Sequence, residues 1–110
     1  MFHIKNLDVL NLADALQEII EAVYREFGLD VVTSAFRPGD PGVHGTLNLR
    51  GIDMRCRDIF IGNHIAYWVN TRWCYDPKRP EKLCCLCHES RSGLHLHFQV
   101  HPNTIRVSKL

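Results

Sequence analysis

The chain has 110 residues, which is enough for one compact domain with a single core and too few for two domains. Hydrophobic residues make up 45% and charged residues 23%, as in ordinary globular proteins, so a single folded domain over residues 1–110 is predicted. The formal net charge of +1 excludes an overall field that would draw the protein onto nucleic acid or a membrane surface, and neither partner is expected.

The N-terminal residues carry no recognisable targeting pattern. Residues 1–8 lack the basic segment and the unbroken apolar run of a secretory signal. No stretch of the sequence approaches the roughly 18 to 20 apolar residues that a membrane span needs. We therefore expect a protein that is cytoplasmic as synthesised.

The first strong pattern along the chain is a helix over residues 11–27. Asn11 is its expected N-cap, and Gly28 follows where a left-handed C-terminal cap belongs. Apolar residues recur at helical spacing and form one stripe, which predicts that this helix is part of the core scaffold. The stripe consists of Leu12, Leu16, Ile19, Ile20, Val23 and Phe27.

Two short strands are predicted next. Residues 31–36 are rich in β-branched side chains, and residues 49–54 form a second apolar run. Two prolines and two glycines fall within residues 37–44, so regular structure is expected to stop there and a loop to present His44.

Residues 59–73 fit a buried strand as well as a helix, and the helix is the favoured interpretation. Phe60, Ile61 and Ile65 would then belong to its apolar stripe. His64 lies on the same stripe, where a hydrogen-bonded core histidine is the expected role. Residues 75–92 contain two prolines and many charges, which predicts a long surface loop.

The five cysteines are odd in number and include an adjacent pair, which argues against a framework of disulfides. Reduced thiols, or thiolates bound to a metal, fit better. A second, structural zinc site at Cys74, Cys84, Cys87 and His88 is the less favoured interpretation.

Residues 93–100 alternate strictly between polar and apolar side chains, which predicts a strand. His95, His97 and Gln99 would share one face, and the apolar residues between them would share the other. A solvent-facing row of histidines without any ligand is the alternative interpretation of this pattern.

A candidate zinc site follows from these elements. His44, Asp53 and one histidine of the His95/His97 pair would supply two nitrogens and one oxygen. Catalytic zinc is held by three protein ligands with a water in the fourth position, and the metal lowers the pKa of that water to about 7. The second histidine of the pair would carry protons beside that water.

Four segments, in this order, resemble one superfamily of zinc peptidases. They are Thr33–Arg37, His44, Arg50–Met54 and His95–His97. The superfamily includes lysostaphin-type enzymes, D-Ala-D-Ala metallopeptidases and the hedgehog signalling domain, and the resemblance spans residues 31–100. It implies an α+β fold in which a small antiparallel sheet follows an N-terminal helix, the hedgehog/D-Ala-D-Ala peptidase zinc fold.

The resemblance also implies roles for individual residues. It makes His44, Asp53 and His97 the ligands of one catalytic Zn²⁺. His95 becomes the catalytic histidine that handles proton transfer. Arg37 matches an arginine that stabilises the developing oxyanion.

Ser34 and Gln99 are the expected substrate-binding residues. The implied activity is hydrolysis of D-alanyl amide bonds in peptidoglycan peptides, by an endopeptidase or a D,D-carboxypeptidase. A phage-type endolysin or accessory lytic protein, released onto the cell wall through a partner pore, fits this activity. The family's general-base glutamate has no match, since Glu89 lies eight residues before His97. The alternative is therefore a non-catalytic zinc-binding structural or interaction module on the same fold.

Overall fold

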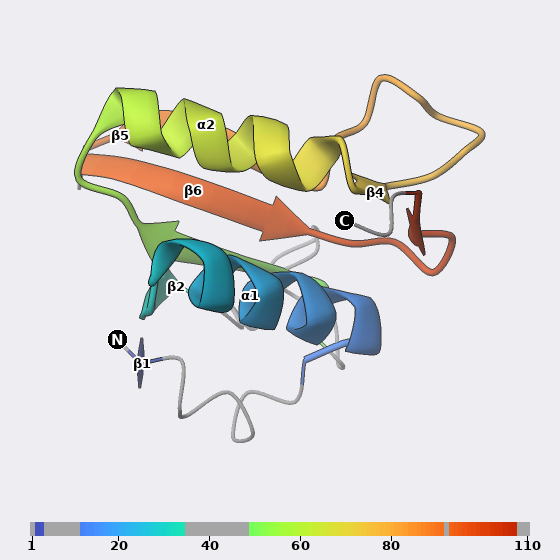
Figure 1. Cartoon of the computed structure of the whole chain (residues 1–110), viewed down its shortest axis with the longest axis horizontal. Coiled ribbons are helices and arrows are strands. Elements are labelled where there is room, and N and C mark those ends of the chain that lie inside the picture. Colours follow the sequence, from blue (N-terminus) through green and yellow to red (C-terminus); the bar gives the residue numbers. More distant parts are fainter. Residues whose placement is uncertain (1, 4–11, 35–48, 92, 108–110) are drawn as a thin grey trace.

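The computed structural model describes residues 2–3, 12–34, 49–91 and 93–107. Both of its helices lie on the same side of an antiparallel sheet (Figure 1). The elements in chain order are β1 (Phe2–His3), α1 (Asp14–Phe27), β2 (Val31–Ser34), β3 (Gly51–Arg55), α2 (Ile59–Asn70), β4 (Trp73–Cys74), β5 (Cys85–Ser90), β6 (Gly93–Gln99) and β7 (Ile105–Arg106).

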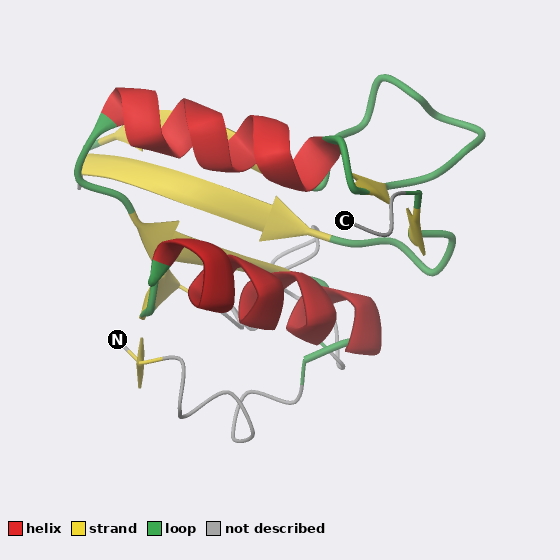
Figure 2. Ribbon diagram, in the orientation of Figure 1, coloured by secondary structure: helices red, strands yellow, loops and turns green. Residues whose placement is uncertain are grey.

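The main sheet has the strand order β1-β2-β3-β6-β5, and all of its neighbouring strands run antiparallel. Its outermost strand, β1, has only two residues, so β2, β3, β6 and β5 form its body (Figure 2). Strands β4 and β7 form a separate two-stranded sheet. The predicted α+β class, the antiparallel sheet and the N-terminal helix are therefore confirmed.

Helix α1 confirms the predicted stripe but starts later than predicted. It begins at Asp14 after an N-cap at Ala13 that makes no side-chain hydrogen bond, and Asn11 lies outside the described residues. The C-cap is Gly28, as predicted, with φ of 71°, a left-handed conformation that glycine adopts without steric cost. The fully buried residues of α1 are Leu16, Ile19, Ile20 and Val23.

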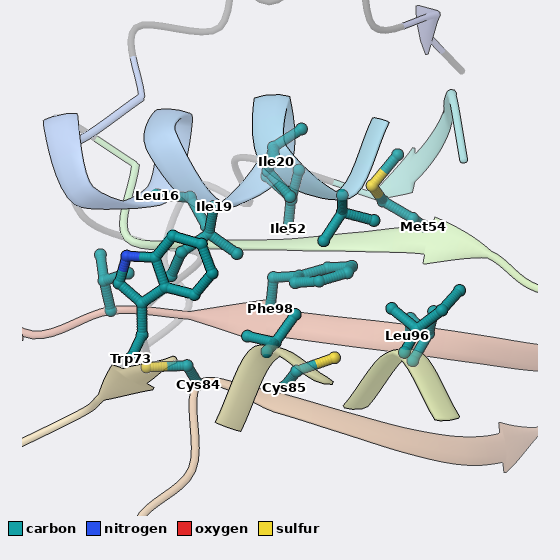
Figure 3. Packing of buried hydrophobic residues seen from close by; sticks show 14 of the residues in the cluster. Leu16, Ile19, Ile20, Ile52, Met54, Trp73, Cys84, Cys85, Leu96 and Phe98 are labelled. Carbon is teal, nitrogen blue, oxygen red and sulfur yellow. The ribbon is translucent and has the colours of Figure 1, made fainter. Parts of the chain in front are cut away.

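Strand β6 lies between β3 and β5 and confirms the predicted alternation. Leu96 and Phe98 are fully buried and pair across the sheet with Met54 and Ile52 of β3. Their side chains point toward the helices and fill the core together with those of α1 (Figure 3). The polar residues that alternate with them, His95, His97 and Gln99, consequently face away from the helices.

Helix α2 confirms the favoured interpretation of its segment. Asp58 is its N-cap, and its Oδ1 accepts hydrogen bonds from the backbone N–H groups of Phe60 at 2.8 Å and Ile61 at 3.2 Å. The buried face of α2 consists of Gly62, Ile65 and Val69.

The predicted stripe of α2 is wrong in its first turn. Phe60 is 81% exposed, because the buried face runs through positions 62, 65 and 69 and Phe60 lies on the opposite side. His64 is also exposed instead of buried in the core. Its ring packs edge-on against Phe27, with the centroids 5.7 Å apart.

The prediction of one long surface loop over residues 75–92 is wrong, because residues 85–90 form strand β5. This strand pairs with β6 along its whole length, from Cys85 opposite Phe98 to Ser90 opposite Gly93. Gly93 has φ of 114° after the turn between the two strands. The alternation within Cys85–Ser90 is short, and the charged residues on both sides of it are typical of a loop.

The two strands predicted over residues 31–36 and 49–54 are present with shifted ends, as β2 and β3. A bulge shifts the register between Val32 and Ser34, so Ser34 lies opposite Asp53. Residues 35–36 and the predicted loop over residues 37–44 lie outside the described residues.

Candidate functional site

The sheet face that points away from the helices carries a cluster of polar side chains, which we call the open face. Residues directly opposite each other on neighbouring strands point to the same face of a sheet. The register pairs Asp53 with His97, and it places His95 between Arg55 on one side and His88 on the other. Strands β3, β6 and β5 therefore each contribute titratable or charged groups to the open face.

Asp53 and His97 are in direct contact at the centre of the open face. Oδ1 of Asp53 lies 2.7 Å from Nδ1 of His97. Asp53 is only 9% exposed, and burying a carboxylate is costly unless it is paired or bound to a metal. The structure thus brings together two of the three predicted zinc ligands.

The second ring nitrogen of His97 also has a partner. Nε2 of His97 lies 3.2 Å from Oε1 of Gln99. The amide nitrogen of Gln99 donates to the carbonyl oxygen of Leu83 at 2.8 Å, so the amide oxygen is the atom that faces His97. Gln99 therefore holds the His97 ring in a fixed orientation.

His95 is positioned by Thr33 of β2. The Thr33 hydroxyl lies 3.4 Å from Nδ1 of His95 and donates to the backbone carbonyl of Asp53 at 3.2 Å. Because a hydroxyl has only one hydrogen to donate, Nδ1 of His95 is assigned as the donor in their contact. In the neutral ring this leaves Nε2 of His95 as the basic nitrogen.

A third imidazole, which the sequence analysis grouped with the cysteines, belongs to the open face. The ring centroid of His88 lies 6.1 Å from that of His95 and 6.4 Å from that of His97. His88 was missed because β5 was predicted to be a loop. The signal that could have found it is the alternation from Cys85 to His88, in which the cysteines face the helices.

Three other predicted site residues cannot be placed in the same way. Arg37 and His44 lie outside the described residues. Ser34 is described at the level of the backbone, where it lies opposite Asp53 at the end of β2. Within the described ranges, no group of three or more His, Cys, Asp or Glu side chains is placed to hold a metal ion.

The residues of the less favoured structural zinc site do not converge. Cys87 lies opposite Leu96 and His88 lies opposite His95, so the two neighbours point to opposite faces of the sheet. Cys84 is fully buried at the start of this segment. Four ligands of one structural zinc must point to a common centre.

All five cysteines are free thiols. Burial raises the pKa of Cys84 to about 12, with a smaller contribution from the neighbouring Cys74. Burial also raises the pKa of Cys85 well above its usual range and raises that of Cys87, with nearby thiols adding to both shifts. A raised pKa favours the neutral thiol, whereas the thiolate is the form that binds a metal. These environments therefore disfavour metal binding by the buried cysteines.

No helix in the described part of the chain is long and apolar enough to cross a membrane. No family model, no curated protein and no solved structure matches this chain. The arrangement of the open face is therefore the basis for a functional proposal.

Proposed function

We propose that this protein is a zinc metallopeptidase with the hedgehog/D-Ala-D-Ala peptidase fold, which hydrolyses D-alanyl amide bonds in peptidoglycan peptides. The observation that carries the proposal is the contact between Asp53 and His97, with His95 beside them on the open face. The sequence motifs that resemble the zinc peptidases contain these three residues. A phage-type lytic role at the cell wall is consistent with this activity.

Two of the three expected zinc ligands lie within the described residues and are in contact with each other. Asp53 Oδ1 and His97 Nδ1 supply an oxygen and a nitrogen from neighbouring strands, and His44 is the expected third ligand. Histidines that bind metals almost always use their other ring nitrogen in a hydrogen bond to an oxygen. The contact between His97 Nε2 and Gln99 Oε1 has this form.

The remaining residues of the face act on substrate and protons. Asp53, His97 and His44 would hold a zinc ion, and the chemistry supplied by a bound zinc would be a hydroxide nucleophile near neutral pH and polarisation of the scissile carbonyl. Nε2 of His95 accepts a proton and returns it to the leaving amine, while Thr33 holds the ring by its other nitrogen. Arg37 is expected to stabilise the developing negative charge on the carbonyl oxygen.

One observation favours a non-catalytic zinc-binding module as a second candidate. Glu89 lies opposite Leu94, so it points to the helix side of the sheet and away from His97. On the open face in the described ranges, the carboxylate in contact with a histidine is that of Asp53, which is already assigned as a zinc ligand. The hydrolytic proposal therefore requires a histidine to do the work that a glutamate base does in other enzymes.

Metal analysis combined with a hydrolysis assay tests the proposal. Purified protein should contain about one zinc per chain, as expected for a single three-ligand site. It should release D-alanine or shortened peptides from muropeptides, and a chelator should abolish this release. Bound zinc without hydrolysis would support the non-catalytic module, whereas folded protein that binds no zinc would contradict both candidates.

A further inference from the structure

A cavity of about 370 Å³ opens at the end of the sheet, where α1 ends and α2 begins. This volume falls in the range of roughly 300–1,000 Å³ that is typical of sites for small ligands. Leu29, Val31 and Ile61 contribute apolar surface to its lining, and Arg55 and Arg57 contribute the positive charges. An apolar group that ends in an anion matches this lining.

The two arginines are available to bind an anion. Both are exposed, and within the described ranges neither guanidinium forms an ion pair or hydrogen bond. Two carboxylates also line the cavity, but Asp58 accepts hydrogen bonds from the first turn of α2, and Asp30 has an interaction of its own. The cavity is therefore lined by two arginines that form no ion pair in the described part of the chain, and by two aspartates that interact with other groups.

Arg55 connects this cavity to the open face. Its Cα lies directly opposite that of His95, and partners in an antiparallel pair are about 4.5–5.5 Å apart. Arg55 is also two residues from Asp53 on β3, a spacing of about 7 Å along the same face. A group bound by Arg55 thus lies within about one or two residues of a peptide bond held at Asp53, His95 and His97.

We propose that Arg55 and Arg57 bind the C-terminal carboxylate of the peptide substrate, whose last side chain enters the cavity. This inference rests on the proposed function and makes the protein a carboxypeptidase. A terminal carboxylate lies one residue beyond the bond that a carboxypeptidase cuts, and consecutive Cα atoms are about 3.8 Å apart. Guanidinium groups bind carboxylates through paired, charge-assisted hydrogen bonds.

The test measures binding without turnover. The probe is an uncleavable analogue of an acetylated L-Lys-D-Ala-D-Ala peptide, in which CH₂ replaces the scissile NH, prepared with a free C-terminal carboxylate and with a C-terminal amide. Isothermal titration calorimetry on wild-type protein should show at least roughly tenfold tighter binding of the carboxylate form, as expected for a charge-assisted contact. Arg55→Gln and Arg57→Gln should each remove most of this preference.

Lys78→Gln is the matched control, because it removes an exposed positive charge that does not line the cavity. This variant should keep the full preference for the carboxylate form. Equal binding of both forms by the wild type, or a preference that survives in both arginine variants, would overturn the inference. Selective binding by a protein that fails to hydrolyse D-alanyl peptides would instead contradict the proposed function and leave the cavity assignment intact.

Discussion

Gly62 on α2 lies directly against the thiol of Cys87 on β5. A Cβ atom added to Gly62 would lie 2.6 Å from Sγ of Cys87 and 3.0 Å from Sγ of Cys56. The first distance is shorter than van der Waals contact allows, so the helix and the sheet approach each other closely because this residue has no side chain. Glycine normally weakens the interior of a helix, and here close packing compensates for that cost.

We predict that Gly62→Ala lowers the free energy of unfolding by about 1–2 kcal/mol. Overpacking of a core typically costs about 1–3 kcal/mol, and the better helix propensity of alanine returns at most about 1 kcal/mol. Urea denaturation followed by circular dichroism measures the change. Combining Gly62→Ala with Cys87→Ala should cost less than the two single losses together, since removing the thiol makes room for the methyl group. Strict additivity would show that the contact does not limit the packing.

Asn70 at the end of α2 fixes the start of β5. Its Oδ1 accepts hydrogen bonds from the backbone N–H groups of Cys84 and Cys85, both at 3.0 Å, and its Nδ2 donates to the carbonyl of Cys85 at 2.8 Å. Asn70→Ala leaves these backbone groups without their partner and should cost about 2–4 kcal/mol in the free energy of unfolding. Asn63→Ala, at an exposed position of the same helix, should change stability by less than about 0.5 kcal/mol. Similar losses in both variants would contradict this role.

The proposed metal site predicts different behaviour for neighbouring histidines. His97→Ala and Asp53→Ala should lose zinc, because each removes a ligand atom. His95→Ala should retain zinc and lose about 10²–10⁴-fold in kcat, because it removes the proton carrier. Zinc content by mass spectrometry and peptide hydrolysis separate these outcomes. If the three variants lose zinc and activity alike, the assignment of roles is wrong.

The buried thiols predict a loss of stability in alkali. The pKa of Cys84 rises from an ordinary value of 9.0 to about 12 in the folded protein, so between these values the folded state keeps a proton that the unfolded state releases. The contribution of Cys84 is complete below about pH 9 and is lost as the pH rises toward 12, at up to about 1.4 kcal/mol per pH unit.

Urea denaturation in reducing buffer at several alkaline pH values measures this slope. Cys84→Ala should show a shallower decline than the wild type, because one shifted thiol has been removed. Cys85 also has a raised pKa, so some decline should remain in the variant. Identical slopes in the two proteins would contradict the assignment to Cys84.

The parts of the fold that could be predicted are those with a clean repeating pattern. The stripe of α1 and the alternation of β6 each span several residues and bury one face, so pattern and structure agree. Phe60 shows where this reasoning fails. An apolar residue in the first turn of a helix fits the helical pattern, but the pattern does not show whether another element of the fold packs against that residue. Strand β5 was missed because its alternation is short and combines cysteines with polar residues.

The residues of the candidate site could be predicted from the sequence only in part. Asp53 and His97 are 44 residues apart, and spacing alone does not show that their strands are neighbours. The resemblance makes both residues ligands of one zinc ion, and the register of β3 and β6 places them opposite each other. His88 and Arg55 required the tertiary structure, because their proximity to His95 depends on which strands flank β6.

Strand β6 supplies the core and the open face from the same seven residues. A shift of its register by one residue would turn His95 and His97 into the core and expose Leu96 and Phe98. A single-residue insertion within this strand would therefore remove the site and the core at once, whereas a shift by two residues would preserve which side chains face each way. Substitutions that keep the alternation and the pairing of Asp53 with His97 should therefore be tolerated better in this strand than insertions or deletions.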